Sequence, residues 1–203
     1  MENQINTLIF DLSEVFISGL LGFEKPLAQV LGCAESDIES SFGGELLQRL
    51  FWGQIDEDAY LMAVRARGGW NTPIAPIKEV IRANFHTVYP GVEALFERLR
   101  QTGRYYTVLL SDHAVEWVDY IYGVHSILQR FDEVIFSYHI QHTKRMPETF
   151  PLVLARIGRR PEECFFVDDS ARNVANAAAA GIAGRQFISA PLLERDLLDL
   201  GLL

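Results

Sequence analysis

The chain has 203 residues, a length that fits one medium domain or a core with a modest insert. Its hydrophobic content of 49% is ordinary for a globular protein, so a sizeable core can be buried. The formal net charge of −9 argues against nucleic acid and against an anionic membrane surface as partners, because both attract a basic face.

The chain carries no recognisable targeting segment. The N-terminal residues lack the basic and apolar regions of a signal peptide, and no stretch approaches the ~20 apolar residues that span a bilayer. Cys33 and Cys164 are the only cysteines, and they have no metal-binding spacing. We therefore expect a cytoplasmic protein with two reduced thiols.

Five short apolar runs, rich in β-branched and aromatic residues, are predicted to be buried strands. In chain order they are Thr7–Phe10, Tyr106–Leu110, Val134–Phe136, Cys164–Val167 and Arg185–Ile188. Helical patterns that each end near a glycine alternate with the later strands. These are Val92–Gln101, Glu148–Ile157 and Asn173–Ala180. The alternation predicts an α/β fold with a mostly parallel, Rossmann-like sheet covered on both faces.

The stretch between the first and second strands breaks this alternation. It shows no clear strand and carries several helical patterns, at Glu24–Leu31, Ser36–Leu50, Asp56–Ala66 and Pro76–His86. Asp56 is a predicted N-cap, and Pro73 and Pro76 mark a connection. We expect a helical insert here.

Polar residues follow the predicted strands. Asp11, Ser111 and the pair Asp168 and Asp169 come directly after three of them, and the loop after Ser137 leads to Lys144. Ligands of open parallel sheets bind beyond the carboxyl ends of the strands, so we expect these side chains to share one crevice. Neighbouring carboxylates repel unless a cation neutralises them, and oxygen ligands near a phosphate favour Mg²⁺. A neutralised carboxylate can then attack phosphorus.

Four groups of residues resemble the motifs of the haloacid dehalogenase superfamily, in the family's order and spacing. They are Phe10–Val15, Leu109–Ser111, Lys144–Phe150 and Val167–Ser170. Supporting matches are Tyr89–Val92, Asn173 and Ala179–Ile182. The likeness covers nearly the whole chain and is nearest to small sugar-phosphatase-like members. It implies a core formed by residues 1–17 and 89–203, and a helical cap formed by residues 18–88.

The resemblance also implies roles for individual residues. Asp11 matches the nucleophile and a magnesium ligand, and Ser13 matches a position whose backbone carbonyl ligates the metal. Ser111 matches the phosphate-binding hydroxyl, and Lys144 matches the cation that steadies nucleophile and phosphate. Asp169 matches a direct metal ligand, and Asp168 matches a residue that holds a metal-bound water. With Asp112 and Asn173, these residues are expected to bind a small phosphorylated substrate.

One position departs from the phosphatase pattern, in which a second carboxylate protonates the leaving group and later activates water. Here that residue is Ser13, and the loss of a general acid–base typically costs about 10²–10⁴-fold. Three interpretations follow: a phosphatase with a borrowed acid, a hydrolase of carbon–halogen or carbon–phosphorus bonds, or a phosphate-binding protein without turnover. Candidate surrogate acids are Glu14, His113, His139 and His142.

Two further departures surround the phosphate position. Asp112 stands where the family usually has a neutral Asn, and Arg145 stands where Pro is usual. We expect Asp112 to point away from the phosphate or to pair with Arg145 or His113. Phe16 and Leu20 are predicted to line a substrate pocket. The sequence does not separate a monomer from a homodimer.

Overall fold

A computed structural model describes residues 5–203, and its centre is a sheet of five parallel strands. The strands are β1 (Thr7–Phe10), β2 (Tyr106–Ser111), β3 (Glu133–Phe136), β4 (Cys164–Asp168) and β5 (Ala183–Gln186). Their order is β3-β2-β1-β4-β5. The chain therefore builds outward from β1 on one side and then on the other, so the order reverses beside β1.

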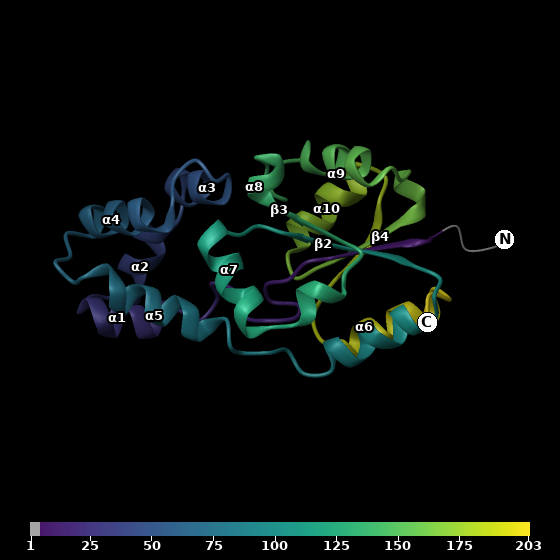
Figure 1. Cartoon of the computed structure of the whole chain (residues 1–203), viewed down its shortest axis with the longest axis horizontal. Coiled ribbons are helices and arrows are strands. Elements are labelled where there is room, and N and C mark those ends of the chain that lie inside the picture. Colours follow the sequence, from purple (N-terminus) through teal and green to yellow (C-terminus); the bar gives the residue numbers. More distant parts are fainter. Residues whose placement is uncertain (1–4) are drawn as a thin grey trace.

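Successive side chains of the central strands belong to two separate hydrophobic clusters. Leu8 and Phe10 belong to one cluster, and Ile9 belongs to the other. Successive strand residues point to opposite faces, so apolar residues at every position mark a strand covered on both sides. The predicted α/β sheet with helices on both faces is confirmed (Figure 1).

The covering helices lie in two layers (Figure 1). On one face, α9 (Thr149–Ile157) and α10 (Ala171–Ala179) contribute to the cluster that contains Ile9. On the other, α6 (Val92–Gln101), α7 (Val115–Val124) and α11 (Ala190–Asp199) contribute to the cluster that contains Phe10. Short elements complete this part of the chain: η1 (Ile127–Arg130), α8 (Ser137–Ile140) and η2 (Pro161–Glu163).

Residues 18–88, which we call the helical segment, stand at one end of the molecule (Figure 1). The segment contains α1 (Glu24–Leu31), α2 (Glu35–Phe42), α3 (Glu45–Phe51), α4 (Glu57–Gly68) and α5 (Ile74–Asn84). The predicted N-cap is confirmed, because the Asp56 side chain accepts a hydrogen bond from the Ala59 backbone N–H at 2.7 Å.

Some element boundaries differ from the sequence predictions. The single helix expected over Ser36–Leu50 is two helices, because the chain turns at Gly43 and Gly44, and Gly44 has φ 77°. The last strand ends at Gln186 rather than Ile188, and its Gly184 lies so close to the Phe166 carbonyl that a Cβ would be 2.7 Å away. Helices α7 and α11 were not among the predicted elements.

The two connections between the helical segment and the sheet run side by side. The Ser18 N–H donates to the Thr87 carbonyl, and the Tyr89 N–H donates to the Phe16 carbonyl, each at 2.9 Å. Glu14 also links these two connections, and its backbone is left-handed, with φ 60°. Its buried carboxylate accepts hydrogen bonds from the Gly19 N–H at 2.7 Å and from the Tyr89 hydroxyl.

A second attachment joins the helical segment to α7. The Glu57 carboxylate, 1% exposed, accepts two hydrogen bonds from Arg82 at 2.6 and 2.7 Å and contacts Lys78 at 3.1 Å. It also accepts the indole N–H of Trp117, a residue of α7, at 2.8 Å. One buried carboxylate therefore joins α4, α5 and α7. Within residues 5–203, no helix is long and apolar enough to cross a membrane.

Candidate active site

The carboxyl ends of three neighbouring strands meet at one edge of the sheet. Ser111 and Asp168 are the last residues of β2 and β4, and Asp11 follows β1 directly. The register pairs Phe10 with Leu109 on one side and with Val167 on the other, so the three strands end almost level. This is the edge, beside the reversal of strand order, at which such sheets bind ligands.

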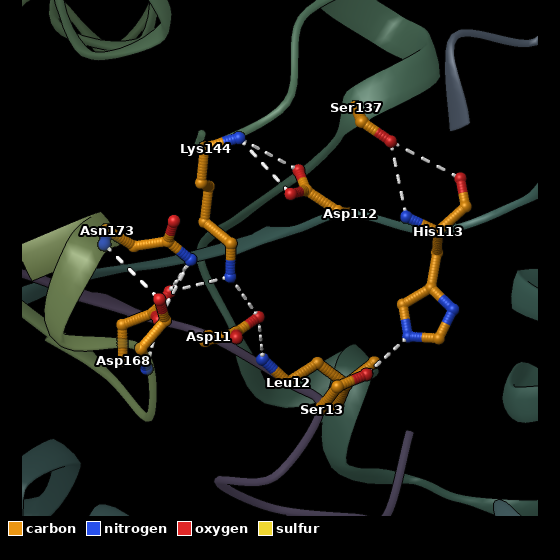
Figure 2. A network of polar contacts seen from close by, with 10 residues as sticks. Asp11, Leu12, Ser13, Asp112, His113, Ser137, Lys144, Asp168 and Asn173 are labelled. Atoms are coloured by element: carbon orange, nitrogen blue, oxygen red, sulfur yellow. Dashed lines mark hydrogen bonds and ion pairs between the residues drawn. The ribbon is translucent and has the colours of Figure 1, made fainter. Parts of the chain in front are cut away.

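Lys144 lies among the acids of this edge. Its ammonium contacts Asp11 Oδ1 at 2.5 Å and Asp168 Oδ2 at 2.7 Å (Figure 2). The loop that carries it is fixed by Asn176, whose side-chain amide donates to the carbonyls of Lys144 and Arg145 at 3.1 Å each. Burial alone lowers the pKa of Lys144, but the adjacent carboxylates outweigh burial and raise it above its usual range. Lys144 therefore stays charged.

The three carboxylates of the site differ in how fully they are bonded. Asp168 is completely buried and accepts hydrogen bonds from the Ser170 N–H at 2.8 Å and from the Asn173 amide at 3.0 Å, in addition to the lysine contact. Within residues 5–203, no other residue donates a hydrogen bond to the Asp169 carboxylate. Asp11 uses Oδ1 for Lys144 and for the Leu12 N–H at 2.7 Å, which leaves Oδ2 open.

These three acids can hold a divalent cation. Asp11, Asp168 and Asp169 each offer a ligand oxygen, and these atoms lie within 4.8 Å of one another. Burial raises the pKa of Asp11 well above its ordinary value, and the neighbouring Asp168 adds to this rise. Burial and Asp168 also raise the pKa of Asp169. An all-oxygen set of mutually repelling carboxylates fits Mg²⁺, which relieves the repulsion.

Two unpaired polar atoms line the same cavity. The Ser111 hydroxyl is buried and has no hydrogen-bond partner in the described chain, and the same holds for Asn173 Oδ1. Buried polar groups without partners are rare in folded proteins and point to a missing ligand or water. The Asn173 amide nitrogen is already committed to Asp168. The Ser111 hydroxyl is therefore free to donate a hydrogen bond into the cavity.

Ser13 follows Asp11 by two residues and contacts a histidine. Its hydroxyl is 2.9 Å from Nε2 of His113, a residue 100 positions away that follows β2 (Figure 2). His113 is 2% exposed, and burial lowers its pKa to about 3, so the imidazole is neutral. The Ser13 backbone carbonyl, the expected metal ligand, accepts no hydrogen bond from the described residues.

Asp112 is oriented by the lysine loop. Both of its carboxylate oxygens accept the Lys144 backbone N–H, each at 3.2 Å. Burial raises the pKa of Asp112 to about 6, and the charge of Lys144 opposes this rise. Arg145 adds a further attraction, but the two side chains form no ion pair, and Asp112 forms no bond to the His113 side chain. Of the two arrangements expected for Asp112, the pairing with Arg145 or His113 is not formed, and the carboxylate faces the lysine loop instead.

A cavity of about 660 Å³ lies over these groups, and the helical segment closes its far side. The segment contributes Gly43 and α3 residues such as Gln48 and Phe51, none of which the sequence assigned to a pocket. A second cavity of about 390 Å³ adjoins it beneath α1 and α2. Leu20 lines this second cavity as predicted, whereas Phe16 is fully buried in the core and lines neither.

The candidate surrogate acids lie in different places. His139 and His142 line neither cavity. Glu14 lines the second cavity, but its carboxylate is committed to the Gly19 N–H and the Tyr89 hydroxyl. His113 alone among the four bonds to Ser13. No sequence signal links Ser13 to a histidine 100 positions away.

The model of the haloacid dehalogenase-like hydrolase family matches residues 5–181. The chain belongs to this family. A comparison with curated proteins found no match. The haloacid dehalogenase-like fold extends over nearly the whole chain, as the solved structures similar to it also indicate.

Three solved structures illustrate the likeness. The HAD family enzyme BT-2542 of Bacteroides thetaiotaomicron, in complex with magnesium and inorganic phosphate, is 21% identical, with a TM-score of 0.75 over 91% of this chain and 95% of that chain. A predicted HAD-like family hydrolase of Porphyromonas gingivalis is 21% identical, with a TM-score of 0.76 over 96% and 98%. The L-2-haloacid dehalogenase RSc1362 is 15% identical, with a TM-score of 0.70 over 96% and 97%. At these identities the likeness concerns the fold.

Proposed function

We propose that this haloacid dehalogenase-like hydrolase is a magnesium-dependent phosphatase that acts on a small phosphorylated metabolite through an aspartyl-phosphate intermediate. One observation carries the proposal. Asp11, Asp169, a buried charged lysine and an unpaired serine hydroxyl face one cavity, and the buried Asp168 carboxylate lies within 4.8 Å of the other two acids. This set offers a nucleophile, a cation site and donors for phosphoryl oxygens.

The residues divide the work according to their bonding. Asp11 is the nucleophile, held by Lys144 and by the Leu12 N–H. The Ser111 hydroxyl donates to a phosphoryl oxygen, and the Lys144 ammonium balances the negative charge that remains. Asn173 fixes the orientation of Asp168. The helical segment acts as a cap that keeps water from the phosphoryl group.

The open ligands favour particular metal contacts. Asp11 Oδ2, the Asp169 carboxylate and the Ser13 carbonyl accept no hydrogen bonds from other described residues, so they are the proposed direct ligands. Asp168 is already held by Lys144, Ser170 and Asn173, which suits a residue that orients a metal-bound water. When bound, Mg²⁺ supplies charge neutralisation for the carboxylates and the phosphate.

The substrate, the compartment and the oligomeric state are proposed from the charge and the cysteines of the chain and from the make-up of the site. The substrate is a small phosphorylated molecule, and local cations such as Lys144 must overcome the net charge of −9. The two unpaired cysteines fit a reducing compartment, so we place the reaction in the cytoplasm. A monomer or a homodimer is compatible with the site, which one chain completes.

A magnesium-dependent assay tests the proposal. Phosphate release is measured from a generic aryl phosphate and a panel of sugar phosphates, for the wild type, Asp11→Asn and the matched control Asp199→Asn on the exposed end of α11. We expect weak release by the wild type and the control, and none by Asp11→Asn. Turnover that persists in Asp11→Asn contradicts the nucleophile assignment.

The same assay separates the other interpretations. A phosphate-binding protein would show saturable, magnesium-dependent phosphate binding with no turnover of any ester. A dehalogenase would release halide from haloacids equally well in the presence of a chelator. The three carboxylates favour the phosphatase, because Lys144 balances only one of their charges and the remaining negative charge calls for a further cation.

A further inference from the structure

The two cavities overlap around Ser13, and the overlap shows where the organic part of a substrate lies. Asp11, Ser111 and Lys144 line only the first cavity. Both cavities are lined by Ser13, Gly43, Leu47, Phe51, Asp112 and Arg145. A phosphoryl group held at the strand ends therefore has its leaving group directed past Ser13 and into the second cavity.

The second cavity is lined largely by apolar and aromatic side chains. Its walls include Leu20, Leu21, Phe23, Phe42, Leu47, Phe51 and Trp117. Among its charged members, Glu39 and Arg145 are exposed and Glu24 is half-buried, whereas the buried Glu14 carboxylate is bonded to Gly19 and Tyr89. A chamber of this composition suits a flat apolar group better than a polyhydroxylated one, since each buried hydroxyl would need a partner.

The bond between Ser13 and His113 fixes the direction of the Ser13 hydroxyl. The imidazole is packed between the rings of Phe85, Trp117 and Phe136, with centroids 5.7, 6.3 and 6.3 Å away. Its Nδ1 is buried and has no hydrogen-bond partner in the described chain. A buried N–H without a partner is rarer than an unpaired acceptor, so we assign the proton to Nε2. Nε2–H then donates to Ser13, whose own O–H is free to donate into the cavity.

No side chain at the overlap is poised to give the leaving group a proton at neutral pH. A serine hydroxyl does not ionise there, and both oxygens of the Asp112 carboxylate face the Lys144 backbone N–H rather than Ser13 (Figure 2). Arg145 does not release its proton in proteins. The leaving oxygen can therefore receive a hydrogen bond but no proton.

From these contacts we infer that the substrate is a phosphate ester of an acidic, apolar hydroxyl of the phenol or enol type, and that Ser13 stabilises the leaving oxygen by a hydrogen bond whose direction His113 sets. The inference rests on the proposed phosphatase function. It narrows the substrate class and makes Ser13 a catalytic residue and His113 a positioning residue.

The step balances without an acid. The Asp11 carboxylate forms a bond to phosphorus, the bond between phosphorus and the leaving oxygen breaks, and its electron pair stays on that oxygen. The oxyanion accepts the Ser13 O–H hydrogen bond and takes its proton from water after it departs. Such a step is fast only when the leaving oxygen is a weak base, which excludes ordinary sugar hydroxyls as good substrates.

The test is a series of substituted phenyl phosphates and alkyl phosphates, with kcat/KM measured against the pKa of the leaving group. For the wild type, we expect kcat/KM to fall steeply as the pKa of the leaving group rises. In Ser13→Asp, which restores an acid, the ratio of kcat/KM between the best and worst esters should be smaller by about 10²–10⁴-fold. Ser13→Ala should lower kcat/KM for the aryl esters by roughly 10²-fold while KM changes little, as for one lost oxyanion donor.

Two histidine variants test the positioning role. His113→Gln keeps an N–H near the position of Nε2 and should retain the wild-type values, whereas His113→Phe should approach Ser13→Ala. If both variants unfold, the comparison of Ser13→Ala with Ser13→Asp still decides the role of Ser13. The inference is overturned if kcat/KM depends equally on the pKa of the leaving group in the wild type and in Ser13→Asp. It is also overturned if this dependence is shallow in the wild type and becomes steep in Asp112→Asn, because Asp112 would then be the acid. Failure of the wild type to release phosphate from any ester overturns the proposed function itself.

Discussion

At the scale of single residues, the site is set by which polar atoms are already bonded. Asp168 accepts from three groups, whereas Asp169 and Asp11 Oδ2 accept from no other described residue. The sequence placed these acids correctly at strand ends, because a short apolar run fixes where a strand stops. It could not reveal the contact of Ser13 with His113, since that contact depends on how the loop after β2 folds back over β1.

The raised pKa of Asp112 predicts a pH dependence of stability. Burial moves this pKa from 3.8 to about 6, so the folded state binds a proton more readily than the unfolded state. Stability from this group is therefore present at low pH and is lost as pH rises through about 6. At pH 8, the free energy of unfolding of Asp112→Asn should exceed that of the wild type by at most about 3 kcal/mol, and near pH 4 the two should differ little.

The check on this prediction is the free energy of unfolding in urea, measured with chelator across that pH range. Asp119→Asn serves as the control, because Asp119 is exposed on α7 outside the cavity walls. A wild type and an Asp112→Asn variant with parallel pH profiles would contradict the raised pKa.

At the scale of elements, the helical segment is held by buried hydrogen bonds as well as by apolar packing. Glu57 begins α4, and its partners lie on α5 and on α7. The helical periodicity of the segment was evident in the sequence, yet the break at Gly43 and Gly44 was not, because apolar spacing continues across it. The edge strand β5 was misplaced for a related reason. Its residues are largely exposed, so they lack the apolar run by which buried strands are recognised.

Removing the Glu57 carboxylate should destabilise the protein strongly. Glu57→Ala leaves the Arg82 guanidinium partly buried without its partner and the Trp117 N–H unpaired, and breaking such a pair costs about 3–5 kcal/mol. Glu79→Ala, an exposed change on α5, should cost less than about 0.5 kcal/mol. Urea unfolding followed by circular dichroism measures both. Equal losses for the two variants would show that Glu57 adds no more than a surface charge.

At the scale of the whole molecule, the site concentrates acids in a protein that is already anionic, with a net charge of −9. The family likeness and the order of the motifs were readable from the sequence, because both follow from strand ends and spacing. The walls of the two cavities were not, since they arise where the helical segment meets the sheet and its loops.

Magnesium should therefore stabilise the entire fold. A cation that binds only the folded state adds about 2.7 kcal/mol when its concentration is 100 times its Kd. Thermal unfolding should shift upward on adding Mg²⁺ to the wild type and much less in Asp169→Ala, whose carboxylate is an open ligand. Glu148→Ala, an exposed acid outside the cavity walls, is the matched control and should keep the shift. An equal shift in all three proteins would mean that the ion binds elsewhere.

The paired connections at Ile17 and Val88 have a consequence for how such a chain can be altered. These two residues form an antiparallel bridge, so the points where the chain leaves and re-enters the sheet lie next to each other. A tight turn joining them would remove some seventy intervening residues without moving any strand, because loop closure over so short a gap costs little entropy. The α/β unit is thus continuous in space although it is interrupted in sequence, and the helical segment can be exchanged for another insert of different shape.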